Sequence, residues 1–326
     1  MLLHATSEIT ATDRFDHVLA RWGVNRSGHR VEPGLYSLGA PSENSPVYVT
    51  ANYTLSFDAL RSALEGADGY ILVLDTSGIN VWCAAGKGTF GTDELVRKLE
   101  STRLSSIVSH RELVLPQLGA AGVSAHEVER RSGFSVTYGP VRAEDLTEFT
   151  RAGRASPDMR RVRFGLADRL VLIPVELVQA ALPCLVAAAV LYFVAGSLAS
   201  WSAVVSLVAG AVLFPVLMPW LPTSNFSTKG LILGLVAALP FAAAAFTGHA
   251  GGAPWERMGW PLVYLLGMPQ VVSFLALNFT GSTTFTSRTG VKREIADYFP
   301  PMVWSFGVAV ALLVALVLAS ALGGSS

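Results

Sequence analysis

The chain has 326 residues, enough for two domains, and it carries 24 basic and 24 acidic side chains. This balance gives no electrostatic reason to expect nucleic acid as a partner. The charges are placed unevenly, because 39 of the 48 precede Val171 and only nine lie from Val171 onward. The sequence therefore predicts a polar first half and a hydrophobic second half.

We expect no signal peptide at the start of the chain. Residues 1–6 lack the positive region and the apolar core of a signal peptide. Residues 1–45 are interpreted as a polar amino-terminal lead without a recognisable motif. Within this lead, Phe15, Val18, Leu19 and Trp22 recur at helical spacing, which predicts a short amphipathic helix over 13–22.

From Pro46 onward, strand-like and helix-like segments alternate. Strands are predicted over 47–50, 70–75, 105–109 and 136–138, with 113–115 extending or following the third. Helices are predicted over 56–65 and 92–101, with Ser56 and Thr92 as caps, and over 124–131 and 143–151. The alternation predicts a doubly wound, Rossmann-like α/β domain covering residues 46–151.

The residues that follow the predicted strands are small or polar. Ligands of doubly wound sheets bind beyond the carboxyl ends of the strands. Thr54, Thr76, Ser109 and Gly139 are therefore candidate cofactor-binding residues. His110 is equally well explained as a ligand contact or as a histidine facing water. No Gly-x-Gly-x-x-Gly follows the first strand, which disfavours a nicotinamide dinucleotide.

The segment 80–87, Asn-Val-Trp-Cys-Ala-Ala-Gly-Lys, holds one of only two cysteines, Cys83 and Cys184. A lone cysteine is most often a small buried hydrophobe. An adjacent Trp82 and a following glycine-rich run instead favour close approach of a bulky ligand, and a thiolate near a helix amino terminus binds metal. Cys184 lies in an apolar run, so we expect no Cys83–Cys184 disulfide and a reducing compartment.

Segment 80–87 resembles the cap-helix motif of HgcA, the corrinoid protein of microbial mercury methylation. Three further stretches resemble the same family: 88–95 (Gly-Thr-Phe-Gly-Thr-Asp-Glu-Leu), 110–120 (His-Arg-Glu-Leu-Val-Leu-Pro-Gln-Leu-Gly-Ala) and 132–142 (Ser-Gly-Phe-Ser-Val-Thr-Tyr-Gly-Pro-Val-Arg). The α/β domain is also similar to the corrinoid domain of the corrinoid iron–sulfur protein of acetyl-CoA synthesis. The resemblance implies that Cys83 is the lower axial ligand of a cobalt corrinoid (cobalamin-type). It also implies that the cofactor is bound by Asn80, Val81, Trp82, Cys83, Ala84, Ala85, Gly86 and Lys87.

The resemblance further implies a corrinoid-dependent methyltransferase that passes the methyl group of methyl-cobalt(III) corrinoid to Hg(II), forming methylmercury. A thiolate below the metal is a strong donor and should favour release of methyl to a soft electrophile. The implied partners are a small ferredoxin-like protein with two 4Fe-4S clusters, which returns electrons to cobalt, and a methyl donor from the methyltetrahydrofolate pathway.

Two other interpretations remain open. The chain is alternatively a membrane-anchored corrinoid methyl carrier for another acceptor in one-carbon metabolism; the corrinoid iron–sulfur protein lacks the motif cysteine and a membrane domain. A third interpretation is a non-catalytic α/β sensing domain tied to a membrane bundle.

Residues 152–169 are interpreted as a basic juxtamembrane linker, because arginines cluster there just before an apolar span. An all-α transmembrane domain over 170–326 is expected, with about five helices at 170–195, 201–221, 230–246, 260–279 and 302–322. Tryptophans near their ends are expected to be interfacial anchors: Trp201, Trp220, Trp260 and Trp304.

The charged residues between the spans predict the orientation of the chain. Lys229, Arg288, Lys292 and Arg293 lie in loops on one side and only Arg257 lies on the other. By the positive-inside rule, the amino terminus and the corrinoid domain are cytoplasmic, in a multi-pass protein of the cytoplasmic (inner) membrane. Glu176 is either functional or interfacial. The polar run 281–287 either covers the cofactor or caps a helix.

Overall fold

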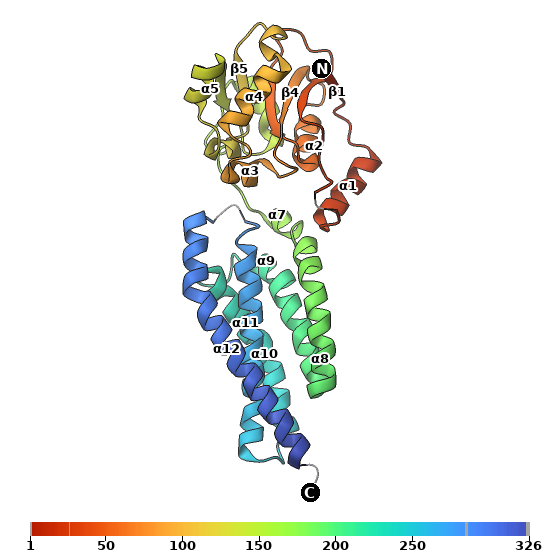
Figure 1. Cartoon of the computed structure of the whole chain (residues 1–326), viewed down its shortest axis with the longest axis vertical. Helices are drawn as coiled ribbons and strands as arrows, with labels where there is room; N and C mark the ends of the chain where they lie inside the picture. The colour runs from red at the N-terminus through yellow and green to blue at the C-terminus, as the bar shows by residue number, and fades with distance from the viewer. Residues whose placement is uncertain (1, 26, 284–285, 324–326) are drawn as a thin grey trace. The chain divides into compact units, whose positions relative to one another are not determined.

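The computed structural model describes residues 2–25, 27–283 and 286–323. It consists of two compact units, which divide between Arg163 and Phe164 (Figure 1). The first unit is an α/β domain and the second is helical. The predicted fold class, an α/β domain followed by apolar helices, is confirmed.

The α/β unit is built on one six-stranded sheet with the order β1-β2-β4-β3-β5-β6. Strands β3 to β6 are mutually parallel, and β1 and β2 run in the opposite direction. The strands are β1 (Leu2–Ala5), β2 (Gly34–Leu38), β3 (Val47–Ala51), β4 (Gly69–Leu74), β5 (Glu112–Leu115) and β6 (Ser135–Tyr138). The chain passes from β3 outward to β4 and then back across β3 to β5, so the sheet reverses its order beside β3.

Helices cover both faces of this sheet (Figure 1). On one face, α3, α4 and α5 pack against strand residues such as Val49 and Leu72 to form the first core. On the other face, α2 and α6 pack against Tyr48 and Ile71 to form the second core. The helices are α1 (Ala11–Arg21), α2 (Thr54–Ala63), α3 (Val81–Lys87), α4 (Thr92–Thr102), α5 (Ala125–Ser132) and α6 (Leu146–Ala152), with short 3-10 turns η1 (Leu104–Ser106), η2 (Gln117–Ala121) and η3 (Ala143–Asp145). This is the doubly wound arrangement expected from the alternating pattern.

The α/β unit extends beyond the predicted boundaries at both ends. The predicted lead supplies β1 and β2, and Leu35 and Leu38 of β2 are buried in the two cores. On the carboxyl side, Met159 is buried in the second core, and its carbonyl accepts a hydrogen bond of 2.8 Å from Val141 N–H. The lead and the first part of the linker therefore belong to the domain. Strands of four or five residues between Gly and Pro are too short to show a clear alternating pattern.

The predicted strand over 105–109 is wrong. Residues 104–106 form the turn η1, and the third parallel strand is β5, further along the chain. Leu104 is fully buried beneath the turn, so its burial follows from the turn rather than from a strand. Two helix starts also differ, because α2 begins at Thr54 after Tyr53 and α4 is preceded by Gly91 in the cap position.

The described residues of the second unit include four helical stretches that are long and apolar enough to cross a membrane: Leu166–Leu217, Phe226–Gly248, Pro254–Phe279 and Thr289–Leu322. Its elements are α7 (Leu166–Leu170), α8 (Ile173–Val208), the π-helical turn η4 (Ala209–Leu213), α9 (Phe214–Leu217), α10 (Phe226–Gly248), α11 (Pro254–Phe279) and α12 (Arg288–Gly323).

The first of these stretches folds back on itself. Gly196 has φ 83° and ψ −174°, a backbone conformation that is essentially restricted to glycine. The thiol of Cys184 lies 3.5 Å from the carbonyl oxygen of Ala203, although nineteen residues of straight helix would separate them by about 28 Å. The stretch is thus two helical segments joined at Gly196, which accounts for the five apolar segments expected.

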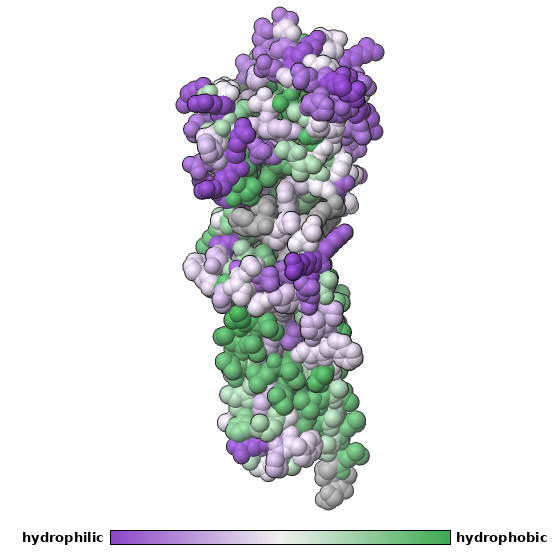
Figure 2. Space-filling view, turned by 90° about the vertical axis from the view of Figure 1, so that its left-hand side faces the viewer, coloured by the Kyte–Doolittle hydropathy of each residue, from purple (hydrophilic) through white to green (hydrophobic). Residues whose placement is uncertain are grey.

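Polar residues gather at the two ends of the helical unit, and an apolar band lies between them (Figure 2). At one end, the Lys229 ammonium donates to the Met218 carbonyl and Ser227 N–H donates to the Glu294 carboxylate. Arg169, expected in the linker, is buried and donates to the carbonyls of Pro215 and Val216. These two carbonyls lie beside a π-helical turn, where the regular helical pattern of hydrogen bonds is interrupted.

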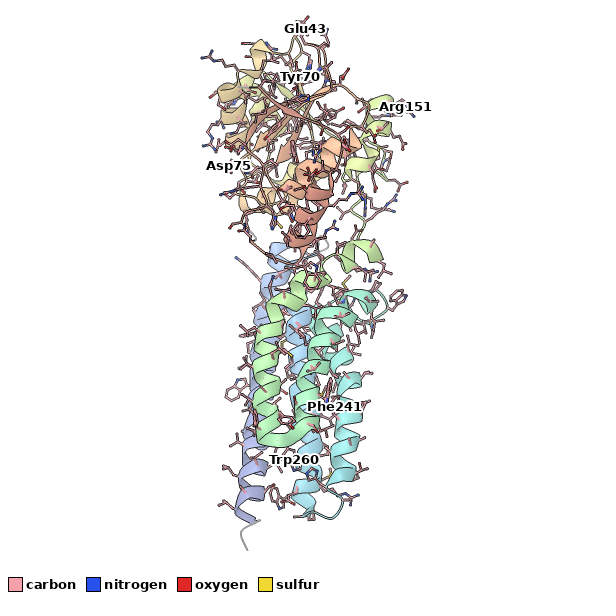
Figure 3. The ribbon with its side chains drawn as sticks, turned by 90° about the vertical axis from the view of Figure 1, so that its right-hand side faces the viewer. Glu43, Tyr70, Asp75, Arg151, Phe241 and Trp260 are labelled. Atoms are coloured by element: carbon pink, nitrogen blue, oxygen red, sulfur yellow. The ribbon has the colours of Figure 1, made fainter. Side chains whose placement is uncertain are left out.

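Three of the four expected tryptophan anchors are exposed: Trp201, Trp220 and Trp304. Trp260 is an exception, since its ring is buried and stacks on His249 with the ring centroids 5.2 Å apart (Figure 3). Its side chain packs inside the helical unit, so the prediction of an anchor at this position is wrong.

Candidate functional site

Segment 80–87 forms the short helix α3 directly after the loop that follows β4. Val81, Ala84 and Ala85 are buried against the sheet, while Trp82 and Cys83 are half-buried and Gly86 and Lys87 are exposed. Cys83 and Gly86 are three residues apart and share the outward side of the helix. A Cβ added to Gly86 would meet nothing within 4 Å, so the surface beside the thiol is open.

Asn80 fixes the first turn of α3. Its side-chain oxygen accepts a hydrogen bond of 2.9 Å from the backbone N–H of Cys83, which is the usual arrangement of an asparagine N-cap. Gly88 ends the helix with φ 88°. The motif residues Asn80 and Cys83 are therefore linked directly, and the backbone under the thiol is held in one position.

The loop that leads into α3 is held by Asn52, which sequence reasoning did not identify. Asn52 follows β3 and is 1% exposed. Its side-chain oxygen accepts hydrogen bonds of 3.0 Å from each of the backbone N–H groups of Thr76 and Gly78. The only signal in the sequence is a polar residue at the end of a strand, and nothing there indicates its partners.

Glu94 of α4 holds the same loop from another side. Its carboxylate accepts a hydrogen bond of 2.9 Å from Asp75 N–H and is itself paired with Arg97 and Lys98. The pKa of Arg97 is raised by its hydrogen bond to Glu94. Loop 75–80 is thus fixed by side chains from β3 and α4 before the chain enters α3.

The other side of α3 packs against η2, most of which belongs to the stretch 110–120 that resembles the same family as segment 80–87. Gly122, just after η2, makes this packing possible, because a Cβ there would clash with the Phe90 carbonyl and lie 2.9 Å from Ala85 Cα. The 80–87 and 110–120 motifs therefore meet in space at the carboxyl edge of the sheet. Tyr138 of β6 donates 2.6 Å to the Val123 carbonyl, and burial raises the pKa of its hydroxyl.

The remaining candidate residues have different surroundings. Thr54 lies at the carboxyl edge and is half-buried. Thr76 lies at the same edge with no exposed surface, and its hydroxyl is 2.8 Å from Asn52 Oδ1 and 2.7 Å from the Ile79 carbonyl oxygen. Gly139 follows β6 and is buried, with its N–H donating 2.8 Å to the Leu115 carbonyl. Thr76 and Gly139 are thus buried residues that hold the backbone at the carboxyl edge of the sheet.

Ser109 lies at the opposite edge of the sheet, so the structure does not bring it to this site. Its N–H donates 2.8 Å to the carbonyl of Glu43, which precedes β3. His110 is held nearby, with Nε2 2.9 Å from the Ser45 carbonyl oxygen. In Figure 3, Glu43, which precedes β3, lies at the top of the α/β unit, and Asp75, which follows β4, lies well below it. The error follows from the strand wrongly predicted over 105–109.

The polar candidates of the helical unit contact one another. Ser282 donates a hydrogen bond of 2.7 Å to the Glu176 carboxylate. Thr280 and Thr286 donate to the carbonyls of Leu277 and Thr280 at the end of α11. The described part of run 281–287 therefore caps a helix; residues 284 and 285 lie outside the described residues.

Within the described ranges, no three His, Cys, Asp or Glu side chains are grouped to hold a metal ion, and the two cysteines form no disulfide.

Comparisons with known proteins concern the α/β unit. Residues 20–150 match the family described as CO dehydrogenase/acetyl-CoA synthase delta subunit. The acetyl-CoA decarbonylase/synthase complex subunit gamma of Methanopyrus kandleri is 39% identical over 126 residues, which are 38% of this chain and 27% of that protein. The corrinoid/iron-sulfur protein large subunit of Moorella thermoacetica is 31% identical over 162 residues, 47% of this chain and 36% of that protein.

The chain thus spans about a quarter to a third of the length of these curated relatives. The residues matched by the family lie in the α/β unit, which is therefore similar to a corrinoid domain like that of acetyl-CoA synthesis.

Proposed function

We propose that this chain is a membrane-anchored, corrinoid-dependent methyltransferase that transfers a methyl group to Hg(II), with Cys83 as the lower ligand of the cobalt. The observation that carries the proposal is the position of the Cys83 thiol on the outward side of α3 at the carboxyl edge of the sheet. The similarity to a corrinoid/iron-sulfur protein supports the class of cofactor. The eight-residue motif supports the acceptor.

The residues around Cys83 fit a large planar group approached from one side. The thiol is half-buried, and Gly86, one turn further on, leaves the neighbouring surface free of side-chain atoms. The alanines of α3 are buried, so the accessible side of the helix is formed by Trp82, Cys83, Gly86 and Lys87. A corrin ring could therefore lie over α3 with the sulfur beneath its metal.

When bound, a cobalt corrinoid supplies a metal that accepts and releases a methyl group. The chain's own contribution is to present a thiolate, a stronger electron donor than imidazole, from a fixed backbone position. Asn80 holds the Cys83 N–H, and Asn52 and Glu94 hold the loop before it. This rigidity would hold the Cys83 sulfur in one position toward a bound corrinoid.

The proposal includes partners and a location. Electrons come from a small ferredoxin-like protein with two 4Fe-4S clusters, and methyl groups come from a methyltetrahydrofolate pathway. The helical unit crosses the bilayer five times with the amino terminus in the cytoplasm. In support, the end of this unit that holds Lys229 also holds Lys292 and Arg293 beside Glu294, whereas Glu256 and Arg257 lie at the start of α11, just after the turn that follows α10.

A second function is a corrinoid methyl carrier for another acceptor in one-carbon metabolism. The similarity to a subunit of an acetyl-CoA decarbonylase/synthase complex favours it. Both functions require the corrinoid and differ only in the acceptor.

The test uses the full chain purified in detergent after reconstitution with a corrinoid. A corrinoid absorption spectrum that changes in Cys83→Ala is expected, together with methylation of Hg(II) when the reducing partner and a methyl donor are present. A normal spectrum without Hg(II) methylation would favour the methyl carrier. A protein that binds no corrinoid at all would exclude both.

A further inference from the structure

Helix α1 attaches to the α/β unit by its polar side. The Asp13 carboxylate lies 2.8 Å from the Arg61 guanidinium, Asp16 lies 2.8 Å from His29 Nδ1, and His17 Nε2 lies 2.7 Å from Asp58. Positions 13, 16 and 17 lie on one face of the helix, and each carries a side chain that pairs with a group of the α/β domain.

The groups that receive this side are themselves buried. Arg61 and Asp58 are nearly inaccessible and pair with each other at 2.6 Å, and Arg61 also donates to the Thr6 and Glu8 carbonyls. Burial opposes ionisation of Asp13, but its hydrogen bonds to Thr10 and Arg61 outweigh burial and lower its pKa. The helix is therefore held by a buried ionic cluster, which fixes its rotation about its own axis.

The opposite side of α1 is apolar and faces outward. Phe15, Val18 and Trp22 are 63%, 50% and 47% exposed, and no residue of the helix is buried. Exposed Arg14 and Arg21 flank this stripe on one side. A surface helix of a globular domain normally buries its apolar stripe and exposes its charges. In α1 this orientation is inverted, and the ionic cluster prevents the helix from turning its stripe inward.

We propose that this stripe, defined by Phe15, Val18 and Trp22, docks on the surface of a lipid bilayer. In the part of the chain that the structure describes, there are four membrane-length helical stretches, the first beginning at Leu166, three residues after the α/β unit ends. A bilayer surface is therefore within reach of the domain by covalent connection. An apolar stripe containing Trp and flanked by arginines is the composition of helices that lie in the headgroup region. The arginines would contact lipid phosphates.

The test places a nitroxide on the stripe in the full chain. Val18→Cys is labelled in a background of Cys83→Ala and Cys184→Ala, and the protein is reconstituted in nanodiscs of phosphatidylcholine and phosphatidylglycerol. Ser101→Cys, exposed on α4, is the matched control. Collisions with oxygen report the apolar phase, and collisions with a water-soluble nickel chelate report water. The oxygen-to-nickel ratio is expected to be several-fold higher at position 18 than at position 101.

Carboxylates in the stripe, introduced as Phe15→Glu with Trp22→Glu, should remove this difference while the circular dichroism spectrum is retained. Equal ratios at positions 18 and 101 would overturn the proposal. So would exclusion of both reagents from position 18, because that result indicates cover by protein, either another part of this chain or a second copy. A ratio that survives the double glutamate change would also contradict it.

Discussion

The two cysteines of this chain are both half-buried, yet their surroundings differ in chemistry. Cys83 lies in the first turn of a short helix, which is capped by Asn80 and whose preceding loop is held by Asn52 and Glu94. Cys184 lies in an apolar helix of α8 and donates weakly to the Ala203 carbonyl across the turn at Gly196. The two thiols have the same class of exposure, so exposure does not distinguish their roles. The difference between them lies in how firmly the surrounding backbone is held.

Replacing Cys83 should have the largest effect. Cys83→Ala removes the proposed donor, so methyl transfer should fall to background and the corrinoid spectrum should change. The free energy of unfolding should change by less than about 1 kcal/mol, because the side chain is half-buried and its neighbours are small. Absorption spectra, Hg(II) methylation and thermal unfolding measure the three quantities.

Cys83→His sharpens the same comparison. Imidazole should keep some metal ligation while donating less charge, so binding should persist with slow transfer. A Cys83→Ala protein with an unchanged spectrum and normal methylation would show that the thiolate is not a ligand, and Cys83 would then be equivalent to Cys184.

Asn52 tests whether the fixed loop is what distinguishes Cys83. Asn52→Ala leaves the N–H groups of Thr76 and Gly78 without their acceptor, and each buried unsatisfied donor costs about 1–3 kcal/mol. We expect a loss of about 2–4 kcal/mol in the free energy of unfolding and weaker corrinoid binding. Asn44→Ala, at the exposed opposite edge, is the control and should cost little. Equal effects of the two changes would contradict this assignment.

Replacing Asn80 should reduce stability and corrinoid affinity less than replacing Asn52. Asn80→Ala removes the cap of α3, which typically costs about 1 kcal/mol. Corrinoid affinity should fall modestly because the first turn carries the thiol, and Asn80→Ser should restore most of the loss. Chemical denaturation and a corrinoid titration of the three proteins provide the measurement; an unaltered affinity in the alanine variant would show that the cap does not position Cys83.

Replacing Cys184 in the helical unit should have the smallest effect on stability and activity. Cys184→Ala removes a thiol that makes a long hydrogen bond of 3.5 Å to the Ala203 carbonyl, so stability in detergent should change by less than about 1 kcal/mol and methylation should be unaffected. A large loss of activity would break the comparison and give the helical unit a part in the chemistry.

Local patterns in the sequence were enough to predict most of the alternation of strands and helices, because each element depends on a few neighbouring residues, such as the apolar run before Asp75. The helix that holds Cys83 was expected from the resemblance of segment 80–87 to a cap-helix motif, and its Asn80 cap was not predicted. The apolar segments of the second unit were predictable for the same reason, because membrane-length hydrophobicity is a property of a continuous stretch.

The features that were missed depend on distant partners. Strands β1 and β2 are short. They are stabilised because β1 pairs with β2 and β2 pairs with β4, and the residues paired in each case are more than 30 positions apart in the sequence. Ser109 was placed at the wrong edge because the position of the third strand was wrong by several residues. The role of Asn52 comes from a loop more than twenty residues later.

Gly196 also decides whether the number of membrane crossings is odd or even. If each apolar segment crosses the bilayer once, the turn at Gly196 makes their number odd, and the two ends of the chain lie on opposite sides. If residue 196 took helical torsions, Leu166–Leu217 would be one continuous rod far longer than a bilayer is thick, and the carboxyl terminus would change sides. The sidedness of everything after residue 196 therefore depends on a backbone conformation that only the smallest residue adopts readily.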